Sequence, residues 1–258
     1  MNKPSFRRFV AVGDSQTEGV GDPYPDGTER GWADRFARSL NERDPGLMYA
    51  NLAIRGRRIA EVHEEQLEPA LALKPDLVSL IAGLNDMIRP GFDLDETIAH
   101  MDMMQAAFRR TGATVLTITY PDPEGLAPIG RLLRDKTFEF NRALREVAGR
   151  NGVLLLDLET TPISSEPRIW CDDRLHLNSE GHRRLSLGMA SLIGIESEDW
   201  LAPLPPVAGP GRLANAAGDL RWAWSFLVPW IGRRLTGRSS GDGRFAKRPE
   251  LALLDDMP

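Results

Sequence analysis

The stretch FVAVGDSQTEG, residues 9–19, joins a short apolar run to a polar turn through a glycine. Residues 9–13 contain no polar side chain, which is typical of a strand that is buried on both faces of a sheet. Four further apolar runs follow along the chain, at residues 48–53, 76–82, 114–119 and 153–158. Runs that are nearly continuous, instead of alternating with polar residues, predict a parallel sheet with helices on both faces.

Segments with helical spacing of apolar residues lie between these runs, at residues 32–40, 59–73, 94–111, 132–151 and 179–193. Strands that alternate with helices indicate an α/β fold, here a three-layer, doubly wound arrangement around a mainly five-stranded parallel sheet. Ligands of such sheets bind beyond the carboxyl ends of the strands. We therefore expect the functional residues in the polar motifs that directly follow each strand.

The composition excludes several classes of protein. The chain has 258 residues, 41% of them hydrophobic, and a net charge of −5, so it lacks the strongly basic character typical of nucleic-acid binding. It has one cysteine, Cys171, and therefore forms no intrachain disulfide. No apolar run has the length of a signal peptide's core or of a membrane span. These features predict a cytoplasmic protein.

The first polar motif, Gly13-Asp14-Ser15, closes the first predicted strand. A serine at a strand-to-helix turn lies beside free backbone N–H groups and the positive end of the helix dipole, which favour a developing negative charge. Ser15 is therefore a candidate nucleophile, with a simple helix-capping serine as the alternative. The segment matches neither a Walker loop nor a dinucleotide-binding glycine motif.

Gly56 and Asn85 follow the second and third predicted strands. Gly56 can bring its backbone N–H close to a substrate oxygen because glycine has no Cβ. Asn85, in the sequence AGLND at residues 82–86, can aim its amide at an oxyanion. Taken alone, Gly56 is better interpreted as an ordinary loop glycine, and Asn85 is equally well interpreted as a turn residue. The functional interpretation depends on their occurring together with the other motifs.

Asp173 and His176 share one predicted loop, in the sequence CDDRLH at residues 171–176. A serine hydroxyl needs a base, and histidine is the side chain whose ordinary pKa lies closest to neutrality. A carboxylate three residues earlier can hold the histidine in the required tautomer. The alternatives are a surface histidine and a metal site made by His176, one of the neighbouring aspartates and His182.

Together these four motifs resemble blocks I, II, III and V of the SGNH (GDSL) hydrolase superfamily, over about residues 6–193. The tail GRSSGDGR also resembles that of actinobacterial-type members. The resemblance implies a flavodoxin-like SGNH fold, a triad of Ser15, His176 and Asp173, and an oxyanion hole formed by the N–H groups of Ser15 and Gly56 with the side chain of Asn85. Many members have a second glycine in block II, where this chain has Ala53.

The chemistry that this resemblance implies is cleavage of a carboxylic ester through an acyl-enzyme, with no metal and no organic cofactor. The enzyme would be an esterase or lipase, including a deacetylase of a small or glycosylated substrate. An acyltransferase that passes the acyl group to a sugar or lipid hydroxyl would use the same residues. A non-catalytic binding module on the same fold is a third hypothesis, although none of Ser15, Asn85, Asp173 and His176 is missing.

A C-terminal extension at residues 203–258 is expected to follow a hydrolase domain at residues 1–202. The sequence APLPPVAGP, residues 202–210, holds too many prolines and glycines for a helix or a central strand. A Trp-rich helix is predicted over residues 212–230, and a basic, flexible tail over residues 236–248. The aromatic side chains predict packing on the body or on a second copy in a homo-oligomer, with a substrate lid or contact with a membrane surface as alternatives.

Overall fold

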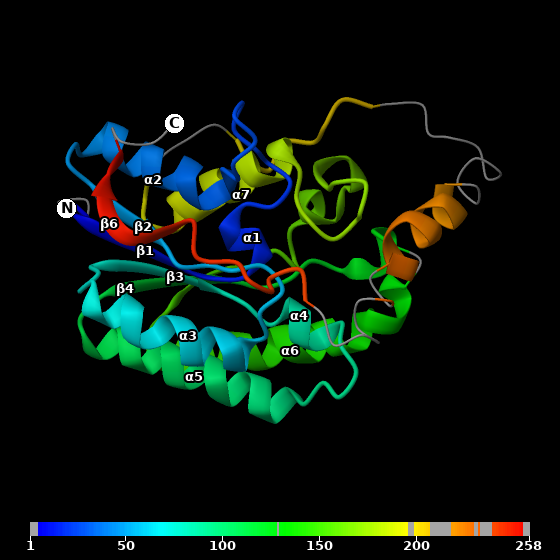
Figure 1. Cartoon of the computed structure of the whole chain (residues 1–258), viewed down its shortest axis with the longest axis horizontal. Coiled ribbons are helices and arrows are strands. Elements are labelled where there is room, and N and C mark those ends of the chain that lie inside the picture. The colour runs from blue at the N-terminus through cyan, green and yellow to red at the C-terminus, as the bar shows by residue number, and fades with distance from the viewer. Residues whose placement is uncertain are drawn as a thin grey trace.

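The computed structural model describes residues 5–127, 129–195, 199–206, 218–229, 232 and 239–254. In these residues a single sheet lies between two layers of helices (Figure 1). Its strands run in the order β5-β4-β3-β1-β2-β6. They are β1 (Arg8–Gly13), β2 (Met48–Asn51), β3 (Leu77–Ile81), β4 (Thr114–Ile118), β5 (Leu154–Leu156) and β6 (Arg248–Leu253). The first five strands are parallel, and β6 pairs antiparallel with β2.

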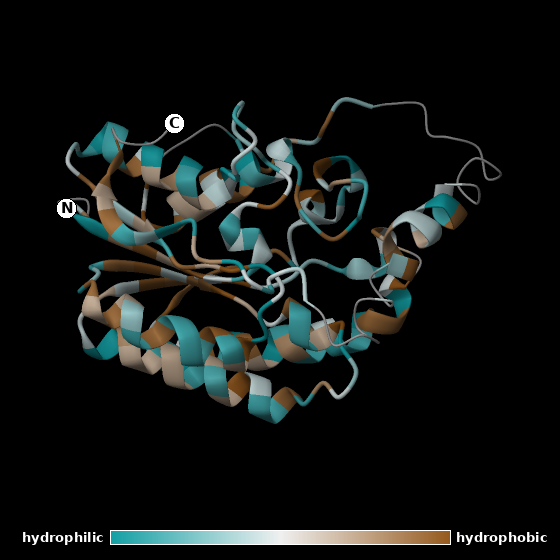
Figure 2. Cartoon of the chain, viewed as in Figure 1, coloured by the Kyte–Doolittle hydropathy of each residue, from teal (hydrophilic) through white to brown (hydrophobic). Residues whose placement is uncertain are grey.

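Five long helices form the outer layers, with α2 and α7 on one face of the sheet and α3, α5 and α6 on the other (Figure 1). Figure 2 shows apolar residues along the strands and polar residues on the outward sides of the helices. The helices are α2 (Gly31–Arg43), α3 (Ile59–Ala72), α5 (Leu94–Arg110), α6 (Gly130–Asn151) and α7 (Ser179–Leu192). Two single-turn helices, α1 (Ser15–Glu18) and α4 (Leu84–Met87), follow β1 and β3. Short 3₁₀ turns lie at Pro123–Gly125, Pro162–Ser165 and Pro167–Ile169.

The predicted three-layer α/β fold with a parallel five-stranded sheet is confirmed, and the strand order is the flavodoxin-like one. This order places the topological switch point between β1 and β3, because the chain leaves β1 toward one edge of the sheet and returns to β3 on its other side. Ser15 follows β1 and Asn85 follows β3. Both therefore lie at the edge where ligands of such sheets bind.

The sequence does not predict β6, and its residues lie next to a stretch that the sequence predicts to be flexible. Pro249 and Glu250 interrupt the apolar pattern, and proline is tolerated in edge strands such as this one. Residues 236–238 are outside the described part of the chain. Gly241 is buried beside Arg55, and Lys247 bonds to the body as described next, whereas residues 242–245 are exposed. The flexible tail over residues 236–248 stays a prediction.

Lys247, just before β6, ties the extension to the core. Its Nζ lies 2.8 Å from Asp34 Oδ1 and donates hydrogen bonds to the carbonyl oxygens of Glu29 and Arg30, at 2.9 and 2.7 Å. Asp34 is buried and also accepts a 2.7 Å hydrogen bond from the Tyr49 hydroxyl. Because a buried carboxylate is costly without a partner, this cation is a structural part of the fold.

Residues 218–229 are helical, with a π-helical centre at Ala223–Leu227. Trp222 is buried in this segment, whereas Leu220 and Trp224 are exposed. Of the predicted tryptophan-rich helix, residues 212–217 and Trp230 lie outside the described part of the chain. None of the described helices has the length and apolar character needed to span a bilayer.

Candidate active site

Ser15 opens α1 directly after β1 and is 8% exposed. Gly13 turns the chain with φ 151°, and a Cβ at this position would lie 2.2 Å from the carbonyl oxygen of Ile81. The side chain of Gln66 in α3 fixes this glycine, accepting from its N–H and donating to its carbonyl oxygen, both at 2.9 Å. Since α1 is a single turn, the backbone N–H groups and not a long helix dipole would stabilise negative charge on Ser15.

Asp14 connects the Ser15 turn to Asn85. Its side chain caps α1 by accepting from Gln16 N, and its Oδ2 accepts a 3.0 Å hydrogen bond from Asn85 Nδ2. Burial raises the pKa of Asp14 to about 6, and the hydrogen bonds and the charge of His176 oppose this rise. One of the two amide N–H groups of Asn85 is thereby engaged, and the other stays available.

Gly56 lies in the turn after β2, with φ 78°. The preceding residue, Arg55, holds this turn through its backbone N–H and its guanidinium, which donate to Glu18 at 2.7 and 2.9 Å. Arg55 also donates to Glu29 at 2.7 Å, and Arg89 donates to the Gly56 carbonyl oxygen. Glu18 belongs to α1, so this ion pair ties the Gly56 turn to the element that carries Ser15.

Asn85 lies in α4, whose first turn is set by Gly83 at φ 116°. A Cβ on Gly83 would meet the ring of Phe140 at 2.7 Å, so this close approach also requires glycine. Asp86 accepts a 3.0 Å hydrogen bond from Ile59 N, at the start of α3. Burial raises the pKa of Asp86 to about 6. The turn after β3 is thus packed closely against α6 and bonded to α3.

The Asp173–His176 loop forms a compact turn before α7. Asp173 Oδ1 accepts from the backbone N–H groups of Leu175 and His176 at 3.0 Å, and its Oδ2 lies 2.6 Å from His176 Nδ1. Burial alone would raise the pKa of Asp173, but the hydrogen bond from His176 brings it below the ordinary value. This bond leaves His176 Nε2 as the ring nitrogen that can exchange a proton elsewhere.

Gln16 brings this loop to the Ser15 turn. Its Nε2 donates to the carbonyl oxygen of Leu175 at 2.8 Å, and its Oε1 accepts from Leu177 N at 3.4 Å. The residue after Ser15 is therefore bonded to both residues that flank His176. Among the described residues no hydrogen bond joins Ser15 Oγ to His176 Nε2, and such bonds are often long before substrate binds.

The comparison with family models identifies the chain. The model of the GDSL-like lipase/acylhydrolase family matches residues 11–184. The chain belongs to this family. Membership makes the protein an SGNH-type carboxylic ester hydrolase, as the resemblance predicts. No curated protein matches the chain.

Solved structures of low sequence identity have the same fold. An α/β hydrolase from the metagenome of Lake Arreo, Spain, is 22% identical with a TM-score of 0.63, over 74% of this chain and 97% of that one. The acetylxylan esterase of Geobacillus stearothermophilus is 21% identical with a TM-score of 0.64, over 78% and 98%. A further acetyl xylan esterase is 21% identical with a TM-score of 0.60, over 71% and 98%.

Two other residues near the site of this GDSL-family hydrolase have structural roles. His182 is buried, accepts from Trp32 N at 3.0 Å and donates to Val20 O at 3.0 Å, and burial lowers its pKa to about 4. With both ring nitrogens bonded, it cannot be the metal ligand considered from the sequence, and no metal-binding cluster occurs in the described part of the chain. Burial, with Asp173 nearby, raises the pKa of the Cys171 thiol to about 11, which disfavours the reactive thiolate form at neutral pH.

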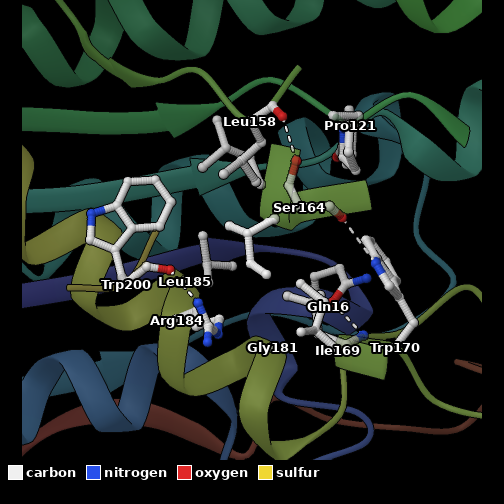
Figure 3. Close-up of a pocket in the computed structure, with 14 residues that line it drawn as sticks. Gln16, Pro121, Leu158, Ser164, Ile169, Trp170, Gly181, Arg184, Leu185 and Trp200 are labelled. Atoms are coloured by element: carbon white, nitrogen blue, oxygen red, sulfur yellow. Dashed lines mark hydrogen bonds between the residues drawn. The ribbon is translucent and has the colours of Figure 1, made fainter. Parts of the chain in front are cut away.

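An apolar pocket lies beside Gln16, at the carboxyl ends of β4 and β5 (Figure 3). It encloses about 40 Å³, which is room for a few water molecules. Ser164 Oγ donates to Leu158 O at 2.5 Å and Arg184 Nη1 donates to Trp200 O at 2.7 Å, whereas the buried hydroxyl of Tyr120 has no hydrogen-bond partner among the described residues. The remaining lining residues are Ile118, Pro121, Ile163, Ile169, Trp170, Leu177, Gly181 and Leu185. Neither Ser15 nor His176 contributes to its lining.

The structure thus places all five predicted site residues at one edge of the sheet, on the turns that the sequence predicts. Three residues that hold them there are not predicted from the sequence, namely Gln16, Gln66 and Trp222. Gln16 stands next to the GDS motif, and that position is the only hint of its role. Nothing in the local sequence distinguishes Gln66 or Trp222 from other helical residues.

Proposed function

We propose that Ser15 is the nucleophile of this hydrolase, His176 its general base and Asp173 the carboxylate that orients His176. The observation that carries the proposal is the position of Gln16. This residue follows Ser15 and is bonded to the backbone on both sides of His176, while Asp173 holds the opposite nitrogen of the imidazole. Nucleophile, base and orienting carboxylate in this order are the parts of a serine hydrolase triad.

In the proposed reaction, His176 Nε2 takes the proton of the Ser15 hydroxyl as Ser15 Oγ attacks the ester carbonyl carbon. The carbonyl π electrons move to the oxygen, which becomes the oxyanion. His176 then gives the proton to the leaving alcohol as the C–O bond breaks, and the acyl group stays on Ser15. Water, deprotonated by the same imidazole, releases the carboxylic acid and restores the hydroxyl of Ser15.

The proposed oxyanion hole consists of the N–H groups of Ser15 and Gly56 and the side chain of Asn85. Neither backbone N–H donates a hydrogen bond to another residue in the described ranges. Asn85 Nδ2 is oriented by Asp14 through one of its hydrogens. Donors that are fixed before the reaction stabilise charge in the transition state without reorganising.

The substrates that we propose are esters with a short acyl group, such as acetyl esters of sugars. Two structural neighbours are named as acetylxylan esterases. A series of p-nitrophenyl esters of graded chain length should give the highest kcat/KM for acetate, and a maximum at long chains would contradict the short-acyl proposal.

The triad is tested by two substitutions. Ser15→Ala should abolish turnover of an activated ester and labelling by a fluorophosphonate, while the unfolding transition stays cooperative. Asn85→Ala should lower kcat by about 100- to 1000-fold, the usual cost of losing one oxyanion donor. Wild-type activity in Ser15→Ala would overturn the assignment, and a loss below about threefold in Asn85→Ala would remove Asn85 from the hole. Product analysis with added acceptor alcohols separates hydrolysis from acyl transfer.

A further inference from the structure

Two tryptophans of the C-terminal extension stand two residues apart and have opposite environments. Trp222 is 8% exposed, whereas Trp224 is 76% exposed. Trp222 contacts the loop that carries Asp173 and His176, because its Nε1–H donates a 2.9 Å hydrogen bond to the carbonyl oxygen of Asp173. The extension therefore contacts the backbone of the residue that orients the proposed base.

The next residue of the loop, Arg174, has an unusual backbone conformation. Its φ is 59°, and Lys74 is the only other non-glycine residue in the described ranges with positive φ. L-amino acids other than glycine are strained in this left-handed region. A strained residue persists where its surroundings hold it in place, so the contacts of Arg174 show what holds this turn.

The Arg174 backbone N–H donates to the carbonyl oxygen of Cys171 at 2.9 Å within the loop, whereas the Arg174 side chain contacts the extension. The Arg174 guanidinium lies 2.6 Å from Asp219 Oδ1 and 5.6 Å from the centroid of the Trp222 ring. With the bond from Trp222 to the Asp173 carbonyl, the extension contacts both the Asp173–Arg174 peptide and the side chain of Arg174. The family model ends at residue 184, so Asp219 and Trp222 lie outside the part of the chain that defines the family.

The position of the Asp173 carboxylate depends on this peptide. Asp173 Oδ1 accepts from the N–H groups of Leu175 and His176, which follow the strained residue, and Oδ2 lies 2.6 Å from His176 Nδ1. A change of φ at Arg174 would rotate the N–H groups away from the carboxylate. The imidazole would then lose the partner that fixes its orientation.

We propose that Trp222 and Asp219 are positioning residues of the hydrolase: they clamp Arg174 in the left-handed conformation and thereby keep Asp173 on His176. The proposal rests on the triad proposed above. The loop is also held by Gln16 and by its own backbone bonds, from Arg174 N to Cys171 O and from Cys171 N to His176 O. Residues 218–229 then add to the support of the active site.

The first test is Trp222→Phe, which keeps an aromatic ring and removes the N–H donor. We expect kcat to fall about 10-fold with KM within about twofold, because misplacing a catalytic group slows chemistry more than binding. The 1H NMR resonance of the proton between His176 Nδ1 and Asp173, assigned by its loss in Asp173→Asn, should weaken in parallel. Trp224→Phe is the matched control and should leave both unchanged. Wild-type kcat and an unchanged resonance in Trp222→Phe would overturn the proposal.

The second test asks whether the strain at Arg174 is what the clamp opposes. Glycine adopts positive φ without strain. Adding Arg174→Gly to Asp219→Asn should therefore raise kcat at least about threefold above that of Asp219→Asn alone. If Asp219 served only general stability, glycine at this loop position would add a further loss. A double variant no more active than Asp219→Asn would therefore contradict the clamp.

The two proposals fail in different ways. If Ser15→Ala retains activity, the proposed triad is wrong and the clamp has no catalytic loop to position. If Ser15→Ala is inactive while Trp222→Phe and Asp219→Asn match the wild type in kcat and in the His176 resonance, the triad stands and only the clamp is wrong.

Discussion

The two halves of the site are held in different ways. The turn that carries Ser15 continues β1, a central strand with β2 and β3 on either side, and Gln66 bonds its backbone. The loop that carries His176 follows β5, an edge strand of three residues, after an irregular stretch with two 3₁₀ turns. The Ser15 turn is thus a direct continuation of the sheet, whereas the loop that carries His176 is attached to this turn through the side chain of Gln16.

This difference predicts where each kind of damage will appear. Substitutions in the Ser15 half disturb the sheet and should act first on stability. Substitutions around the His176 loop remove single hydrogen bonds, so they should act first on kcat. In this way the proposed nucleophile is held by the sheet, while a second, weaker set of contacts determines the position of the proposed base.

Gly13→Ala should have the largest effect on the free energy of unfolding. The new Cβ would lie 2.2 Å from the Ile81 carbonyl oxygen, which belongs to the neighbouring strand and cannot move freely. Overpacking together with an unfavourable φ should cost about 3–5 kcal/mol, measured by urea unfolding. Gly27→Ala is the matched control, because its φ is also positive at 85° but no atom lies within 4 Å of the added Cβ. An equal cost at both positions would show that the Ser15 turn is less constrained than its contacts indicate.

The same contrast explains how much of the molecule the sequence predicts. The five parallel strands and five long helices are predicted because each carries a long apolar run or a sustained helical period. The strand β6 is missed because Pro249 and Glu250 interrupt its pattern and pairing with β2 alone defines it. At the site, motif residues are predictable because they follow strands. The partners of Gln16 are not, since they lie 159 and 161 residues away and are bonded through backbone atoms.

The buried carboxyl of Asp14 should make the Ser15 half sensitive to pH. Burial raises its pKa to about 6 in the native state, from an ordinary value of 3.8. The native state then binds more protons than the unfolded state between these values, so the contribution of Asp14 to stability falls as pH rises through about 4 to 6. Asp14→Asn can still accept a hydrogen bond from Asn85 and does not titrate. It should therefore remove the contribution of Asp14 to the loss of stability and raise the free energy of unfolding by up to about 3 kcal/mol at pH 8.

Urea unfolding of the wild type and Asp14→Asn at pH 4, 6 and 8 measures this effect. Asp26→Asn is the control, because Asp26 is fully exposed and Thr28 lowers its pKa. It should leave the fall of stability above pH 4 unchanged. If Asp14→Asn and the wild type lose stability in parallel from pH 4 to pH 8, Asp14 is not the group responsible.

The smallest expected effect on stability compares two glutamines that each bond backbone atoms in one half of the site. Gln66→Leu removes two 2.9 Å bonds to Gly13 and leaves the Gly13 N–H buried without a partner. This should lower the free energy of unfolding by about 2–3 kcal/mol. Gln16→Leu removes bonds of 2.8 and 3.4 Å and should cost only about 1 kcal/mol. It should nevertheless lower kcat by about 10-fold at unchanged KM, because the loop that carries His176 loses its attachment to the Ser15 turn. If Gln16→Leu destabilises the fold as much as Gln66→Leu and keeps wild-type kcat, both glutamines contribute to stability alone. The two halves of the site would then be held in the same way.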